Sequence, residues 1–248
     1  MATSNTTSQQ PPLHLHTYFR SSCSGRLRIA LRLKQLPFTT TAVHLLKNEQ
    51  SAADYKSLNP SGTVPTLTHT HTTGDDDGGI RKTVTITQST AALEYLDEAF
   101  PSSTPALFPK GSTPDAIEQR AHVRTLVAII ACDTQPLTNS KPIKAVNEMG
   151  RDGQAWARDW TVRGLDAFEG YLARTMVEAS QGKWCVGTGV TAADVCLVPA
   201  VWAAQRWGCD MERWPKIMGV FRHMESLDEV KAAHWRRQED TPEEFREA

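Results

Sequence analysis

The sequence predicts a chain of two parts, a mixed α/β domain followed by an all-helical domain. Over residues 13–100, strand-like and helix-like segments alternate in the order β-α-β-α-β-β-α. Residues 101–114 are rich in Pro and Ser, as in a linker. Over residues 115–248, apolar residues recur at helical spacing and no convincing strand is found. This pattern predicts a sheet with helices packed against it, joined to a helical domain.

The first four elements alternate strand and helix. Residues 13–19, LHLHTYF, alternate apolar and polar positions, which favours a strand. Residues 24–36 have the apolar spacing of a helix, and Pro37 ends it. β-branched residues favour a second strand at 38–45, and residues 51–58 are typical of a short helix.

The last three elements of the first domain are a pair of strands and a helix. Residues 64–70 and 82–88 are strand-like and are expected to form a hairpin. The helix at 89–100 has Ser89 as its expected N-cap, and Pro101 closes it.

The segment that joins the two hairpin strands is rich in His, Asp and Gly. His69 and His71 alternate, so they can share one strand face, and Asp75 to Asp77 follow closely. A metal site is conceivable in this segment. A solvated hairpin extension is the better interpretation, and we expect no metal.

The helical domain contains three long segments with apolar residues at helical spacing: 116–133, 153–180 and 191–208. The third begins with Thr191 and Asp194 at the spacing of a capping box, so both residues are expected to be structural. The charged tail at 239–248 is expected to fray.

The composition is that of an ordinary globular protein, with 40% hydrophobic and 22% charged residues. A balance of 27 basic against 28 acidic residues leaves a net charge of −1 and gives no reason to expect nucleic acid or membrane as a partner. The apolar runs are too short to span a bilayer. Residues 1–12 lack the features of a secretory signal or transit peptide and are expected to be a disordered tail.

The five cysteines are irregularly spaced and form no CxxC motif, which argues against a zinc ribbon or a dithiol redox site. This usage indicates a reduced, cytoplasmic protein. Cys132, Cys196 and Cys209 lie in apolar, helical-looking sequence and are expected to be buried, as is Cys185.

Three residues at the start of the first predicted helix, Ser21, Ser22 and Cys23, have functional groups suited to chemistry. A helix N-terminus offers unpaired N–H groups and the positive end of the helix dipole, which together stabilise a thiolate. Serine hydroxyls can donate hydrogen bonds to such a sulfur. The alternative is that Ser21 or Ser22 only caps the helix, with Arg26 and Arg28 as solvated charges.

Two later turns have features of a binding site for an extended, anionic ligand. Pro65 opens a strand after a Gly-containing turn, which suggests a cis Val64–Pro65 bond. The backbone N–H and C=O of Val64 would then be free to pair with an added strand. Gln88 and Ser89 join a strand to a helix, where Ser89 and the following N–H groups can hold a carboxylate. The alternatives are an ordinary hairpin turn and a simple N-cap.

Taken together and in this order, these motifs resemble those of zeta-class glutathione transferases, the maleylacetoacetate isomerase family. The resemblance covers nearly the whole chain after the first dozen residues. The VP turn and the QS pair are general to glutathione transferases. The stretch SSCSGRLRIAL at 21–31 is more specific to the zeta class, as is IACDTQPLTN at 130–139, and DVCLVPAVWAAQRWGCD at 194–210 agrees.

The resemblance implies a thioredoxin-like, glutathione-binding domain at 13–100 and a helical substrate domain at 115–248. It implies that Arg206 binds a substrate carboxylate. The residues that match the family's glutathione site are Ser21, Ser22 and Cys23 around the sulfur, Gln50 at the glycyl end, Val64 and Pro65 at the cysteinyl part, Gln88 and Ser89 at the γ-glutamyl group, and Gln135 and Asn139 in the helical domain.

Two departures from the family pattern stand out. Gly25 replaces a Trp, which is expected to leave more room beside the site and to widen the choice of substrate. The hairpin extension at 69–79 is longer than the family's tight hairpin, which puts local partner or dimer-edge contacts in doubt more than the chemistry.

The implied activity is the cis–trans isomerisation of maleylacetoacetate to fumarylacetoacetate, in phenylalanine and tyrosine breakdown, by a cytosolic homodimer with glutathione as cofactor. The glutathione thiolate adds to the alkene, the resulting single bond rotates, and elimination restores glutathione. Ser22 (or Ser21) would hold the thiolate. Cys23 is not required as a nucleophile, although a covalent or redox role stays open.

Three alternatives remain at this point. The same site would serve a transferase that conjugates glutathione to small electrophiles or dehalogenates haloacids. A binding protein of this fold would grip glutathione without turnover, although the presence of every gripping position argues against it. A glutaredoxin-like oxidoreductase would use Cys23, but the chain lacks a CxxC motif and has a full helical domain.

Overall fold

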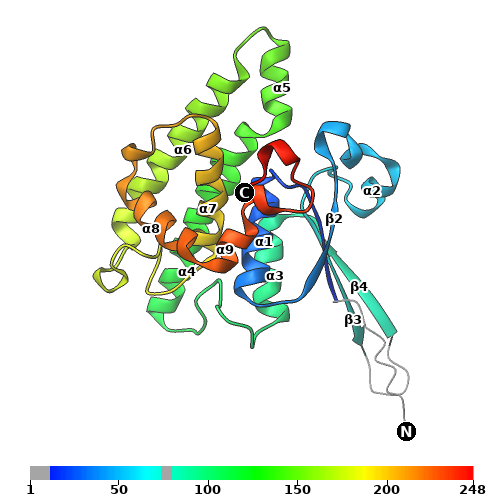
Figure 1. Ribbon diagram of the computed structural model, residues 1–248. Helices are drawn as coiled ribbons and strands as arrows, with labels where there is room; N and C mark the ends of the chain where they lie inside the picture. Colours follow the sequence, from blue (N-terminus) through cyan, green and yellow to red (C-terminus); the bar gives the residue numbers. More distant parts are fainter. Residues whose placement is uncertain (1–11, 74–79, 248) are drawn as a thin grey trace.

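The computed structural model describes residues 12–73 and 80–247. A mixed four-stranded sheet with its helices forms the first half, and helices form the second half (Figure 1). The predicted class, a thioredoxin-like part followed by an all-helical part, is confirmed. Residues 1–11 and Asp75 to Asp77, which carry most of the expected disordered tail and part of the conceivable metal site, lie outside the described residues.

The sheet has the strand order β2-β1-β3-β4. The first strand, β1 (Leu13–Thr17), pairs in parallel with β2 (Phe38–Ala42) and antiparallel with β3 (Thr66–Thr73). The edge strand β4 (Ile80–Ile86) pairs antiparallel with β3. Along β1 every second side chain is fully buried, as the alternating sequence predicts, because successive side chains of a strand point to opposite faces.

Two helices, α1 (Ser22–Leu33) and α3 (Ser89–Ala99), cover the sheet face that is turned toward the helical half, and the short helix α2 (Ala53–Leu58) lies on the other side (Figure 1). His69 and His71 share one face of β3, with ring centroids 5.1 Å apart. The His69 ring is hydrogen-bonded to the Tyr95 hydroxyl of α3 at 2.7 Å. Within the described residues, no group of three or more potential metal ligands is found.

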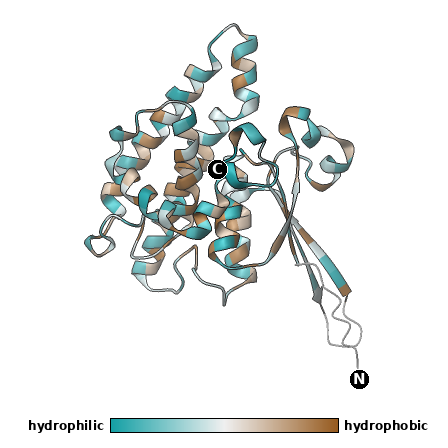
Figure 2. Ribbon diagram, in the orientation of Figure 1, coloured by the Kyte–Doolittle hydropathy of each residue, from teal (hydrophilic) through white to brown (hydrophobic). Residues whose placement is uncertain are grey.

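The helical half contains α4 (Pro114–Ala128), α5 (Ser140–Glu148), α6 (Gly153–Thr175), α7 (Ala192–Arg206), α8 (Pro215–Ser226) and α9 (Asp228–Ala233). Helix α7 is buried along most of its length and forms the apolar centre of this half (Figure 2). Helix α1 packs directly on α7, so one core joins the two halves. No helix of the described chain has the length and apolar character needed to cross a membrane.

The predicted capping box at the start of α7 is confirmed. The Asp194 carboxylate is fully buried and accepts hydrogen bonds from the Thr191 backbone N–H at 2.7 Å and the Thr191 hydroxyl at 2.8 Å. It also accepts one from the Cys185 N–H at 2.8 Å. These three donors fix the loop before α7 to the first turn of the helix.

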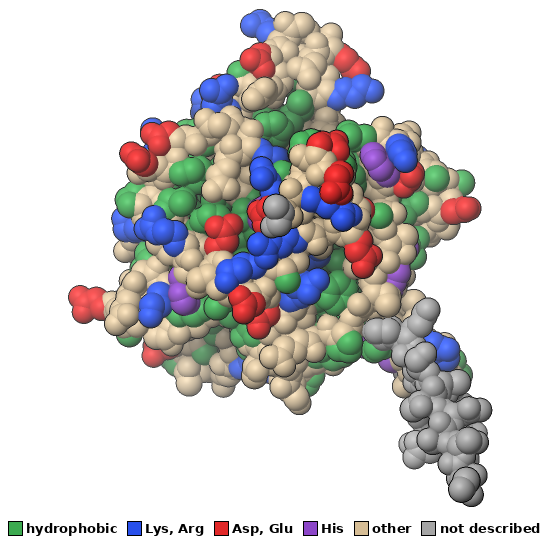
Figure 3. Space-filling model, viewed as in Figure 1, with side chains coloured by type: hydrophobic (Ala, Val, Ile, Leu, Met, Phe, Trp, Pro, Cys, Tyr) green, Lys and Arg blue, Asp and Glu red, His purple; other side chains and the backbone are tan. Residues whose placement is uncertain are grey.

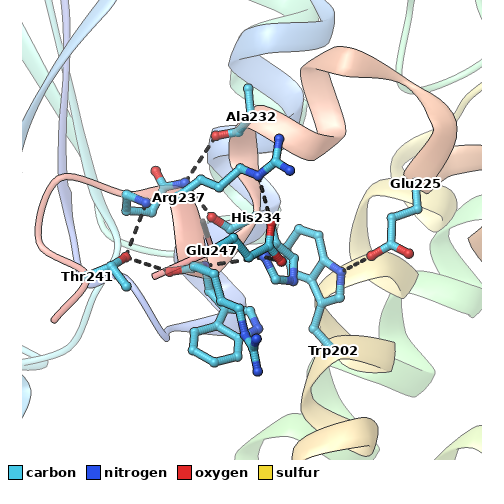
Figure 4. Close-up of polar contacts among 10 residues, drawn as sticks. Trp202, Glu225, Ala232, His234, Arg237, Thr241 and Glu247 are labelled. Atoms are coloured by element: carbon cyan, nitrogen blue, oxygen red, sulfur yellow. Dashed lines mark hydrogen bonds and ion pairs between the residues drawn. The ribbon is translucent and has the colours of Figure 1, made fainter. Parts of the chain in front are cut away.

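The C-terminal tail does not fray as expected but packs back onto the body of the protein (Figures 1 and 4). Acidic and basic side chains lie close together on this face of the molecule (Figure 3). Thr241 is buried, and its hydroxyl donates to the Trp235 carbonyl at 2.7 Å. Glu247 accepts a hydrogen bond from Arg237 at 2.8 Å. The Asp240 carboxylate accepts from the Phe19 N–H at 2.7 Å, which ties the tail to the loop before α1. The charged composition was misleading because these charges pair with the body of the fold.

Candidate active site

A pocket of about 290 Å³ lies where the first turns of α1 and α3 meet the end of α4. Four of the predicted site residues line it: Cys23, Gln88, Ser89 and Gln135. The remaining lining residues are Arg26, Thr90, Glu94, Phe108, Arg124, Val127, Ala128, Ala131 and Cys132. The other predicted residues lie outside this pocket: Ser21, Ser22, Gln50, Val64, Pro65, Asn139 and Arg206.

The start of α1 divides the capping and ligand roles between two serines. Ser21 is the N-cap, and its hydroxyl oxygen accepts from the Ser24 N–H at 3.1 Å. Ser22 is the first helical residue, is half-buried, and its hydroxyl makes no hydrogen bond to any described residue. Ser22 therefore has a donor free for a ligand, whereas Ser21 is used by the helix.

The turn before β3 presents unpaired backbone groups. The Val64–Pro65 peptide bond is cis, as predicted. Asn59 supports the turn from beneath, because its side-chain amide donates to the Thr63 carbonyl at 2.8 Å. No described residue forms a hydrogen bond with the N–H or C=O of Val64. Both groups are therefore available to an extended ligand.

The start of α3 corrects one expectation. Gln88, not Ser89, occupies the N-cap position, and Ser89 is the first helical residue. The Ser89 hydroxyl oxygen does not cap the helix but accepts a hydrogen bond from Nη1 of Arg26 at 3.0 Å. The residue is 6% exposed and lines the pocket. The first-turn N–H groups of α3 and the Ser89 hydroxyl thus face the pocket together.

Arg26 and Arg28 are not solvated charges but are 2% and 1% exposed. Arg28 is satisfied by the backbone, since its guanidinium donates to the Tyr18, Phe19 and Ala233 carbonyls at 3.3, 2.9 and 3.2 Å. Arg26 instead lines the pocket. The sequence offers no clear sign of this burial, because alternating Arg and Leu is also typical of an exposed helix face.

Cys132 is another correction, because it is exposed and lines the pocket, whereas Cys196 and Cys185 are buried as expected and Cys209 is half-buried. It lies in a π-helical turn, Ile129–Thr134, that continues α4. The Thr134 hydroxyl donates to the Ile129 carbonyl at 2.7 Å across this turn. The wider π-turn rotates Cys132 away from the helical core.

Three predicted residues lie on other elements: Gln50 between β2 and α2, and Asn139 and Arg206 in the helical half. Gln50 sits in a 3₁₀ turn, where its amide nitrogen donates to Asn48 at 2.9 Å and its amide oxygen is buried without a partner in the described chain. Asn139 is the N-cap of α5 and accepts from the Ser140 N–H at 2.8 Å. Arg206 ends α7.

Arg206 is a half-buried cation beside aromatic rings. Its guanidinium lies 5.6 Å from the Trp207 ring centroid and 6.0 Å from that of Trp235. Burial, and then the positive charge of Arg20, lower the pKa of Arg206 to about 10. No carboxylate among the described residues forms an ion pair with either arginine. The region therefore carries uncompensated positive charge suited to an anionic substrate.

Gly25 does not leave the expected free space. A Cβ atom at this position would lie 3.1 Å from Cγ of Pro199 and 3.6 Å from the Trp202 ring. Helix α7 therefore occupies the space beside Gly25. The glycine allows α1 to pack closely on α7 and does not widen the site.

Comparisons with known proteins agree with this arrangement. The N-terminal domain model of glutathione S-transferases matches residues 20–99, and the C-terminal domain model matches residues 157–228. The chain is 52% identical over 239 residues to a maleylacetoacetate isomerase of Aspergillus fumigatus, covering 96% of this chain and 97% of that protein.

Solved structures of isomerases are also similar to this chain. A maleylacetoacetate isomerase from Anaeromyxobacter dehalogenans, with GSH bound in its active site, is 34% identical with a TM-score of 0.78, covering 94% of this chain and 100% of that one. The holo structure of a bacterial maleylpyruvate isomerase, a zeta-class glutathione S-transferase, is 35% identical with a TM-score of 0.77, covering 92% and 100%.

Proposed function

The chain belongs to the glutathione S-transferase family, among its zeta-class maleylacetoacetate isomerases, and on this premise we propose that it isomerises maleylacetoacetate to fumarylacetoacetate with glutathione. The observation that carries the proposal is the 52% identity to such an isomerase over nearly the whole of both chains. We further propose that residues 13–100 bind glutathione, that 101–114 link the domains, and that 115–248 form the substrate side.

The residues fit glutathione at each of its ends. The unpaired Val64 backbone suits the cysteinyl part, and the buried, unpartnered amide oxygen of Gln50 suits the glycyl end. Ser89, with Gln88 and the first turn of α3, suits the γ-glutamyl carboxylate. Gln135 lies across the pocket, and Asn139 stands one turn further along the chain.

Bound glutathione supplies a thiolate that adds to the cis double bond and leaves again after rotation. The chain's part is to hold that sulfur charged at neutral pH. Ser22 donates its free hydroxyl hydrogen to the sulfur, and the N-terminal N–H groups of α1 add the positive end of the helix dipole. Cys23 lines the pocket together with Gln88 and Ser89, and the reaction does not require it to bond to the substrate.

Substrate recognition rests on positive charge near the C-terminal end of α7. Maleylacetoacetate carries two carboxylates, and Arg206 and Arg20 form no ion pair within the described chain. Arg206 is held by Trp207 and Trp235, so its guanidinium is positioned before the substrate arrives. We assign Arg206 to a substrate carboxylate.

The test is an isomerisation assay with maleylacetone, an analogue of maleylacetoacetate, with and without glutathione. The proposal expects turnover only when glutathione is present, with a rate that saturates in both reactants. A protein that binds glutathione in a calorimeter but never isomerises maleylacetone would instead be a binding protein of this fold.

We propose in addition that the protein is a homodimer in the cytoplasm and serves phenylalanine and tyrosine breakdown. The free state of all five cysteines supports a reducing compartment. The dimer is checked by light scattering on the full chain, where a monomeric mass at micromolar concentration would contradict it.

A further inference from the structure

The pocket contains a buried positive charge whose hydrogen bonds are incomplete. Arg26 is 2% exposed and lines the pocket. Its Nη1 atom donates to the Ser89 hydroxyl oxygen at 3.0 Å, but Nε and Nη2 have no partner in the described chain. A buried guanidinium without an anion is costly to the folded state, so this arrangement requires an explanation.

No carboxylate of the described residues neutralises this charge. The one acidic side chain that lines the pocket, Glu94, is held by Arg124 at 3.0 Å. The other side chains near Arg26 that can carry negative charge are the thiols of Cys23, Cys132 and Cys196. Burial lowers the pKa of Arg26, and the negative charge that these three groups carry as thiolates raises that pKa above its ordinary value.

Two other buried cations, Arg28 within α1 and Lys34 at its C-cap, have purely structural partners. Arg28 donates four hydrogen bonds, three of them to backbone carbonyls. Lys34 is 3% exposed and forms an ion pair with Asp97 at 2.7 Å while donating to the Pro105 carbonyl at 2.9 Å. Both hold loops of the fold. Arg26 holds no backbone group, and its single bond leads to a pocket side chain.

We propose that Arg26 is a positioning residue that aims the Ser89 hydroxyl into the pocket and supplies the counter-charge for a carboxylate bound there. Because Ser89 accepts from Nη1, the hydroxyl hydrogen is left to donate to the ligand. The inference rests on the proposed function in one respect, since the carboxylate is then the γ-glutamyl carboxylate of glutathione.

The test is calorimetric binding of glutathione, and of cysteinylglycine, which lacks the γ-glutamyl group, to Arg26→Met and Arg26→Lys. Loss of charge-assisted hydrogen bonds is expected to weaken glutathione binding by about ten- to a hundredfold in Arg26→Met. Arg26→Lys, which restores a charge, should recover part of that loss. Cysteinylglycine affinity should not change.

A double-mutant cycle of Arg26 and Ser89 distinguishes a positioning role of Arg26 from a general effect on protein stability. The effect of Ser89→Ala on glutathione affinity should shrink in the Arg26→Met background, because the hydroxyl is no longer oriented. Lys34→Met removes the buried cation at the C-cap of α1, which does not line the pocket; it is the control and should lower the melting temperature with unchanged affinity.

Each outcome decides one claim. Wild-type protein that binds no glutathione overturns the proposed function itself. Wild-type binding with undiminished affinity in Arg26→Met, or additive effects of the two substitutions, overturns the role of Arg26 alone. Should Arg26→Met fail to fold, Arg26→Lys decides. The inference is contradicted if Arg26→Lys weakens the binding of glutathione and of cysteinylglycine equally and leaves the effect of Ser89→Ala on glutathione affinity undiminished.

Discussion

Substitution of Gly164 by alanine tests the π-turn that brings Cys132 and Gln135 to the pocket. Gly164 is buried in α6, directly beneath Thr134 at the end of that turn. A Cβ atom at this position would overlap the Thr134 hydroxyl oxygen and would lie 2.7 Å from Thr134 Cγ2 and 2.8 Å from Thr134 Cβ. All three atoms are too close, so the π-turn or α6 has to move.

Two opposing effects determine how much Gly164→Ala changes the free energy of unfolding. Alanine is a better helix former than glycine and alone contributes up to about 1 kcal/mol of stability. Overpacking of a close-packed contact costs about 1–3 kcal/mol, and here the crowding atoms belong to a β-branched side chain whose hydroxyl is already bonded at 2.7 Å. We therefore expect a net loss of up to about 2 kcal/mol, which lowers the melting temperature by several degrees, about 2–4 °C per kcal/mol for a chain of this size.

The assay is thermal unfolding followed by circular dichroism, together with the glutathione KM. A matched control is Gly170→Ala in the same helix, where a Cβ atom meets nothing within 4 Å, so the melting temperature should rise. Thr134→Ala in the Gly164→Ala background should recover part of the loss. A Gly164→Ala protein as stable as Gly170→Ala, with an unchanged KM, would refute the packing argument.

Three further predictions follow from the site, the cap and two half-buried histidines. Ser22→Ala should cut kcat by about ten- to a hundredfold by weakening the hold on the thiolate, while Cys23→Ala should do less; the reverse order in the isomerisation assay would make Cys23 the nucleophile. Asp194→Ala should lower the melting temperature with near-normal KM in the folded fraction, because it leaves three buried donors unpaired, and full stability with lost activity would contradict this. Burial lowers the pKa of His16 and of His234 from 6.5 to about 4, so the unfolded chain binds more protons and the unfolding free energy should fall as pH drops from 6.5 toward 4. Urea unfolding at pH 7 and pH 4.5 should show a smaller loss in His16→Gln than in the wild type.

The local signals in the sequence were sufficient where a feature depends on neighbouring residues. The order of elements, the cis Val64–Pro65 turn and the Thr191–Asp194 capping box follow from spacing, turn chemistry and a four-residue motif. Each is a short-range property, so no knowledge of the tertiary fold is needed.

The features that the sequence could not predict depend on contacts between distant segments. Arg26 is buried because α1 packs between the sheet and α7, and a repeating Arg–Leu pattern does not reveal that both sides are covered. Cys132 is exposed because a π-turn shifts its face, which α-helical spacing conceals. The tail containing Asp240 is ordered by a bond to Phe19, 221 positions earlier in the chain.

The central claim is that the reaction borrows the sulfur of glutathione and returns it, and the direct measurement is the balance of glutathione during turnover. Wild-type enzyme is supplied with maleylacetone and a limited amount of glutathione, and product and free thiol are followed together over many turnovers. The account predicts that fumarylacetone formed exceeds the glutathione supplied many times over while free glutathione stays constant. Glutathione consumed one for one with maleylacetone would show a conjugating transferase, and isomerisation without any glutathione would show that the protein uses a sulfur of its own.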